Sequence, residues 1–181
     1  MLKMDKPSSA LSILSLSFIN AVKHFAGPLD YESVYMKAKS DYVLTPLPTD
    51  AIETMMSATA AVSGVALLCD GYGGKIADVA ATDTAFPRRA GTQFCIQYYS
   101  SWTKASDTAS HVADVAKVYA GMRPFMPGAS YVNYCDLDLT DYAEAYWGDN
   151  LPRLMSVKAE YDPQNLFRHA QSVPLPPSPQ V

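Results

Sequence analysis

Thr92-Gln-Phe-Cys-Ile-Gln-Tyr-Tyr-Ser-Ser-Trp102 is the stretch from which the fold can be predicted. It follows Gly91, and its side chains alternate in character with the period of two that is typical of a β-strand. The two expected faces consist of Phe94, Ile96 and Tyr98 on one side and of Gln93, Cys95, Gln97 and Tyr99 on the other. The apolar face predicts a covering layer of helices, whereas the second face is polar and aromatic.

The rest of the chain supplies elements of both kinds around this strand. Strands are expected over residues 34–43, 65–70 and 131–136, and helices over 11–25, from Thr49 onward, 105–122, 141–147 and 151–161. No Gly-rich strand-to-helix crossover indicates a doubly wound sheet. We therefore predict an α+β fold: one antiparallel sheet with helices packed on one face, in a single domain over residues 1–175 that is followed by a Pro-rich tail, 176–181.

Composition excludes several classes of function. The net charge is −4 without a run of Lys or Arg, which argues against a nucleic-acid or anionic membrane surface. Three widely spaced cysteines form neither a zinc motif nor a closed set of disulfides. The apolar run 10–22 continues directly into Lys23-His-Phe-Ala-Gly27, so we read it as mature structure and expect a cytoplasmic rather than a secreted protein.

The last third of the chain contains a dense series of motifs. They are Tyr131-Val-Asn-Tyr-Cys-Asp-Leu-Asp-Leu139, Ala145-Tyr-Trp-Gly-Asp-Asn-Leu-Pro-Arg-Leu154 and Val157-Lys-Ala-Glu-Tyr-Asp-Pro-Gln-Asn-Leu-Phe167. Shorter motifs precede them in order at 37–43, 70–74, 86–91 and 96–98. Together these stretches resemble the later part of the berberine-bridge-enzyme-like group of FAD-linked oxidases, over about residues 16–175.

The resemblance implies two catalytic candidates, Gln97 on the central strand and Tyr134 in the Tyr-Val-Asn-Tyr motif. A neutral amide cannot act as a general base, so Gln97 would orient a substrate. An unperturbed Tyr titrates near pH ~10, so Tyr134 would need a nearby positive charge to act as a base. Without the resemblance, strand pairing and ordinary packing would explain both residues.

The substrate-binding candidates are Tyr99, Tyr131, Asn133 and Cys95, and Asn165 is a flavin contact if a partner supplies FAD. We expect no metal site, since Asp136 and Asp138 lack a third hard ligand at suitable spacing.

Members of this family hold FAD in a separate N-terminal domain, and no stretch here resembles its Gly-Gly-His attachment segment or its pyrophosphate loop. We therefore expect no cofactor within this chain. The leading hypothesis is a flavin-independent cyclase or isomerase of secondary metabolism that acts on a small natural product. The alternatives are the substrate-domain half of a split or truncated FAD-linked oxidoreductase, with a flavoprotein partner or self-association, and an inactive remnant. Exposed apolar residues around Tyr99 and Tyr131 would favour a partner, and a concave pocket would favour the cyclase.

Overall fold

A computed structural model describes residues 17–20 and 34–177 of the chain. The chain divides into two compact units, 1–33 and 34–181, and the sheet and its helices belong to the second. Most of the helix expected over 11–25 lies outside the described residues.

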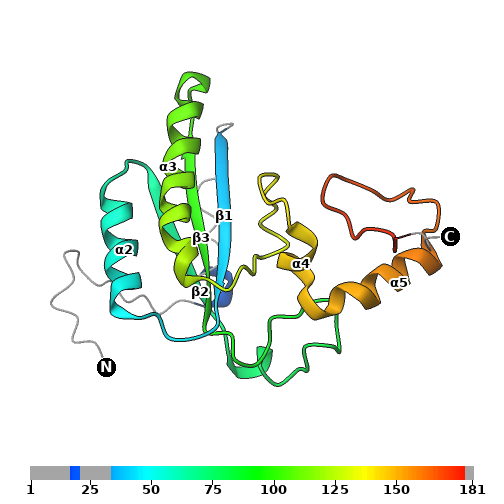
Figure 1. Cartoon of the computed structure of the whole chain (residues 1–181). Coiled ribbons are helices and arrows are strands. Elements are labelled where there is room, and N and C mark those ends of the chain that lie inside the picture. Colours follow the sequence, from blue (N-terminus) through cyan, green and yellow to red (C-terminus); the bar gives the residue numbers. More distant parts are fainter. Residues whose placement is uncertain (1–16, 21–33, 178–181) are drawn as a thin grey trace. The chain divides into compact units, whose positions relative to one another are not determined.

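The second unit is built on a three-stranded antiparallel sheet with the order β1-β3-β2 (Figure 1). The strands are β1 (Tyr35–Val43), β2 (Val65–Gly71) and β3 (Phe94–Trp102), and β3 is central. The α-helices of this unit are α2 (Thr49–Ala60), α3 (Thr108–Met122), α4 (Tyr142–Trp147) and α5 (Leu151–Tyr161). The α+β class and the antiparallel pairing predicted from the sequence are confirmed.

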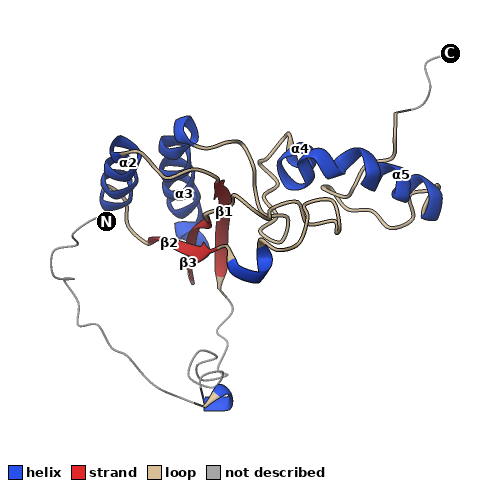
Figure 2. Ribbon diagram, turned by 90° about the horizontal axis from the view of Figure 1, so that it is seen from below, coloured by secondary structure: helices blue, strands red, loops and turns tan. Residues whose placement is uncertain are grey.

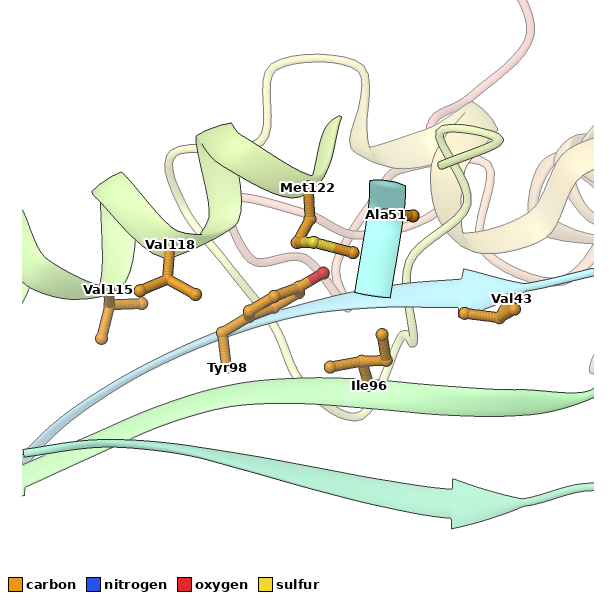
Figure 3. Close-up of a cluster of buried hydrophobic side chains, with 7 residues drawn as sticks. All are labelled: Val43, Ala51, Ile96, Tyr98, Val115, Val118 and Met122. Atoms are coloured by element: carbon orange, nitrogen blue, oxygen red, sulfur yellow. The ribbon is translucent and has the colours of Figure 1, made fainter. Parts of the chain in front are cut away.

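The main core lies between the sheet and the pair α2 and α3, which lie on the same face of the sheet (Figure 2). Ile96 and Tyr98 on β3 are fully buried there, as their alternation predicted. Val115, Val118 and Met122 of α3 pack against them (Figure 3). This contact fixes which side chains of β3 are directed to the opposite face.

That opposite face is defined by the strand register. Directly paired residues of antiparallel strands direct their side chains to the same side. Gln97 pairs with Ser40 of β1 and with Leu68 of β2, and Tyr99 pairs with Ala38 and Ala66. None of the described helices covers this face (Figure 2), so we call it the open face.

The strand predicted over 131–136 is wrong, because this segment is a series of turns. The amide of Tyr134 donates to the carbonyl of Tyr131 at 2.9 Å, which closes a turn in place of a strand ladder. The amide of Tyr131 donates to Ser40 Oγ at 2.9 Å, and this contact holds the start of the segment against β1. The turns direct the aromatic rings of the motif toward the open face.

Candidate functional site

Tyr134 lies at one end of the open face, beside the last residues of β2. Its hydroxyl donates a long hydrogen bond of 3.4 Å to Asp70 Oδ2. Burial, followed by the charge of Asp70, raises the pKa of Tyr134 above its usual value. No cation among the described residues reverses this shift, so Tyr134 is a hydrogen-bond donor at neutral pH and cannot serve as a base.

Gln97 lies in the middle of the open face and is half-buried. Among the described residues its side-chain amide has no hydrogen-bond partner, although both neighbouring strands lie beside it. Leu68, its neighbour on β2, is 45% exposed. Amide groups inside proteins are normally paired, so this amide is free to bind a ligand on the face.

An aromatic cluster closes the face on the side of the 131–136 turns. The rings of Tyr131 and Tyr134 lie 5.0 Å apart at 79°, and Tyr131 also meets the ring of Tyr42 at 6.1 Å. Asn133 is exposed, and its amide donates to the hydroxyl of Tyr131 at 2.7 Å. Such edge-to-face contacts hold the rings in fixed orientations.

Cys95 lies beneath this cluster and is only 1% exposed. Burial raises the pKa of its thiol to about 12. Cys95 therefore packs against Tyr42 and Ala129 and supports the aromatic rings from below. A neutral, enclosed thiol of this kind has no nucleophilic role.

Asn165 lies elsewhere, in the turn after α5, where its backbone has the left-handed φ of 52°. Among the described residues it forms no side-chain hydrogen bond, and the side chain that pairs with this turn's backbone is Asp162. The structure therefore brings together Gln97, Tyr99, Tyr131, Asn133 and Tyr134 around the open face, with Cys95 below it, and it places Asn165 in a separate turn.

Asp70 is the residue that sequence reasoning missed. It pairs with Cys95 across the β2–β3 ladder, and this register directs its carboxylate to the open face. The available signal was the period of two in β2, which places Asp70 two positions after Leu68.

In the described part of the chain no three His, Cys, Asp or Glu side chains are grouped as metal ligands. None of the described helices has the length and apolar character needed to cross a bilayer.

Comparison with known proteins agrees with this geometry. Residues 130–174 match the family described as "Berberine and berberine like". The chain is 34% identical over 186 residues to "Monolignol oxidoreductase AtBBE-like 13" of Arabidopsis thaliana, across 89% of this chain and 35% of the relative. The chain belongs to the berberine-bridge-enzyme-like family. It is thus a member of the FAD-linked oxidase superfamily, and it spans about a third of the length of the curated relatives that it matches.

Solved structures of the family share the fold of this berberine-bridge-enzyme-like chain. Berberine bridge enzyme from Eschscholzia californica superposes with a TM-score of 0.76 at 28% identity, over 81% of this chain and 34% of the other. The Bermuda grass isoallergen BG60 superposes with a TM-score of 0.73 at 34% identity, over 78% and 33%. The sheet, its helical layer and the turns after α3 are therefore a part of the family fold.

Proposed function

We propose that this region is the substrate-binding side of an FAD-linked oxidoreductase that acts on a small hydroxylated aromatic natural product. The observation behind the proposal is the open face, where the unpaired amide of Gln97 lies among exposed apolar and aromatic side chains. A relative also supports the proposal: the chain shares 34% identity with the monolignol oxidoreductase of Arabidopsis thaliana.

The residues of the open face fit one side of a planar ring system. Ala38 and Ala66 flank Tyr99 across the sheet, so small side chains leave its centre flat. No strand position of this face bears Lys or Arg that could meet a pyrophosphate. The fit is therefore to the ring of a flavin alone, and the rest of FAD would be held by a partner flavoprotein or by further sequence. When bound, the flavin would accept a hydride.

Binding and orientation are assigned to the polar groups of the face. Gln97 would hydrogen-bond a substrate hydroxyl, since its amide both donates and accepts. Tyr99 and Tyr131 would contact the substrate ring, and Asn133 holds the hydroxyl of Tyr131 at 2.7 Å. This set positions a small aromatic compound and does not itself remove a proton.

Proton transfer is assigned to the pair formed by Tyr134 and Asp70. The raised pKa of Tyr134 keeps its phenol protonated, so its single proton, which is donated to Asp70 in the free protein, would turn to the substrate oxygen when substrate binds. Asp70 is exposed, and its carboxylate can accept the proton that a hydroxyl loses on oxidation. The two roles thus fall on different residues: Tyr134 would hold the substrate oxygen by a hydrogen bond, and Asp70 would accept the proton.

A flavin-independent cyclase or isomerase is the second candidate. It is favoured by the closure of the aromatic cluster beside Tyr131 into a concave pocket, because a cyclase needs shape, hydrogen bonds and one proton transfer from this chain alone. The oxidoreductase is preferred because the chain is 34% identical to a relative named as a monolignol oxidoreductase.

The test has two parts. The first compares the visible absorption spectrum of the 181-residue chain before and after addition of FAD and desalting. The second measures the affinity of the wild type and of variants for a monolignol. For the oxidoreductase we expect Gln97→Leu and Tyr134→Phe each to weaken monolignol binding about tenfold, a loss equivalent to ~1.4 kcal/mol. Tyr161→Phe, which alters an exposed tyrosine at the end of α5, should change nothing. Rearranged product formed without any flavin would support the cyclase, and monolignol binding unaffected by both variants would refute the role of the open face.

A further inference from the structure

A cavity of about 450 Å³ lies beside Tyr131 and is lined by residues of the 72–89 segment, of the 131–133 turns and by Trp147. This volume is in the ~300–1,000 Å³ range of pockets that bind small molecules. The side chains that define it are Tyr72, Phe86, Arg89, Tyr131, Asn133 and Trp147.

Four of the ten residues that line the cavity are aromatic. Phe86 lies between Tyr72 and Tyr131, with centroid distances of 6.2 and 6.0 Å. Trp147, which is 8% exposed, also lines the cavity. Walls of this kind favour a flat aromatic ligand, which can form offset or edge-to-face contacts with several of them.

Arg89 is the one charged residue in the lining of this cavity. Its guanidinium lies 5.0 Å from the ring centroid of Phe86, and it donates one hydrogen bond, of 2.7 Å, to Thr84 Oγ1. Its buried Nε has no hydrogen-bond partner among the described residues, and none of their carboxylates forms an ion pair with it. An arginine in such a state has donors available for a planar anion.

The hydroxyl of Tyr131 is a second polar group of the cavity. It accepts a hydrogen bond from the amide of Asn133 at 2.7 Å, so its own proton is free to be donated. The cavity thus offers a cation and a neutral donor within an aromatic enclosure.

We propose that this cavity is a subsite for an aromatic carboxylate, with the carboxylate on Arg89 and the ring among Phe86, Tyr72 and Tyr131. The inference rests on the proposed function in one respect: Tyr131 and Asn133 line this cavity and also belong to the open-face site, so the acid is bound as an extension of the substrate or as a separate effector. In either case the selective chemistry is a negative charge on an aromatic ring. The subsite also explains why Arg89 is held against Phe86 without an acidic partner among the described residues.

The experiment measures binding of 4-hydroxycinnamate and of the matching neutral alcohol to the 181-residue chain by isothermal titration calorimetry, without flavin. We expect the acid to bind at least tenfold more tightly than the alcohol. Arg89→Gln should remove this preference while binding of the alcohol stays unchanged, and Arg89→Lys should restore part of it.

Arg153→Gln is the matched control, since Arg153 is an exposed arginine that binds only the carbonyl of Thr82 at 3.0 Å. It should leave the preference intact, and circular dichroism should show that every variant is folded. Competition by the alcohol against the acid would identify an extended substrate, and independent binding would identify an effector. Equal affinities for acid and alcohol, no binding of either, or a preference that survives in Arg89→Gln would overturn the subsite. The preference for the acid over the alcohol is measured without flavin and does not depend on Gln97, so loss of the preference alone is distinct from failure of the proposed function, which is read from binding of the alcohol.

Discussion

At the scale of single residues, Asp41 is a carboxyl group whose burial opposes its ionisation. Its side chain is fully buried on the helical side of β1, where Arg123 forms an ion pair with it and Tyr98 donates a hydrogen bond of 3.1 Å. Burial outweighs these partners and raises the pKa of Asp41 from its usual 3.8 to about 6. The folded protein therefore binds a proton here more tightly than the unfolded chain does.

We predict that Asp41 makes the stability of the protein fall as the pH rises. Its contribution is complete below about pH 4 and is lost as the pH increases through about 6. The loss amounts to about 3 kcal/mol, since each tenfold change in proton affinity is worth ~1.4 kcal/mol. Urea unfolding of the wild type and of Asp41→Asn at pH 4, 5, 6 and 7 measures it.

The Asn variant should lack this fall, so its free energy of unfolding relative to the wild type should increase from pH 4 to pH 7. Asp83→Asn, which alters an exposed carboxylate, is the control and should run parallel to the wild type. Parallel curves for Asp41→Asn as well would contradict the prediction.

At the scale of elements, the tight connection between α2 and β2 depends on Gly64. Its φ is +77°, and a Cβ placed there would lie 3.0 Å from Cε1 of His111. His111 is itself fixed by stacking on Trp102 at 4.9 Å and by a hydrogen bond of 2.7 Å with Ser100. The imidazole therefore cannot move away without breaking both contacts.

We expect Gly64→Ala to destabilise the protein by about 1–3 kcal/mol, because it combines a strained backbone with a steric contact. Thermal unfolding followed by circular dichroism measures the change. Gly71→Ala is the matched control, since Gly71 has no positive φ and its added Cβ would meet nothing within 4 Å. Equal melting temperatures for the two variants would show that the connection tolerates a side chain.

The link between β1 and the 136–139 turn is a cluster of charges. Lys39, 7% exposed, lies 2.6 Å from Asp136 and 3.0 Å from Asp138, and Lys37 contacts the same two carboxylates. Removal of one partner from a buried pair leaves the other without compensation, which costs several kcal/mol.

We predict that Lys39→Met lowers the free energy of unfolding by about 3 kcal/mol, with Lys37 still neutralising part of the charge. Urea titration at pH 7 measures the loss. Lys75→Met removes a lysine whose side chain is 98% exposed from its pair with Asp78, and it should leave the unfolding midpoint unchanged. A similarly small effect of Lys39→Met would mean that the cluster is too hydrated to matter.

Local patterns were sufficient for β3 and α3 and insufficient for the 131–136 segment. Ile96 and Tyr98 are buried against α3 because alternation and helical periodicity are local properties of the sequence. The aromatic and β-branched residues of 131–136 also favour a strand, but the contact of Tyr131 with Ser40, 91 residues away in sequence, decides the outcome. Such a tertiary contact has no signature in a short window of sequence.

The same distinction holds for the candidate site. Alternation on β3 together with the family resemblance placed Gln97 on the open face, whereas the role of Asp70 depends on the register between β2 and β3. The cavity at Arg89 depends on segments that approach one another only in the folded chain. Residues that share an element could be predicted to act together, and residues brought together by packing could not.

At the scale of the whole molecule, the second unit exposes large apolar side chains at the corner that follows α5. Tyr161, Leu166 and Phe167 are 77%, 71% and 81% exposed. Single exposed hydrophobic residues are common, but three within one short segment indicate a contact surface. We propose that a partner chain or a second copy would bind through this surface.

We therefore expect the isolated chain to associate in a concentration-dependent way, and Phe167→Ser to reduce the association. Sedimentation velocity at two concentrations tenfold apart measures it. Leu137→Ser, which alters a residue 75% exposed in the 136–139 turn, is the control. A single, concentration-independent species in the wild type would contradict the prediction.

Gln171 has a consequence for the synthesis of the protein. Its buried amide donates to the carbonyl of Asp136 at 2.7 Å, and its oxygen accepts from the hydroxyl of Tyr146 at 3.0 Å. Asp136 in turn neutralises Lys37 and Lys39 on the first strand of the unit. Domains fold as they leave the ribosome, but here the ion pairs of Lys37 and Lys39 are made with Asp136 and Asp138 of the 136–139 turn, and Gln171 in turn bonds the carbonyls of Asp136 and Leu139. The hydrogen bonds that Gln171 gives to this turn therefore form only after residue 171 has been translated.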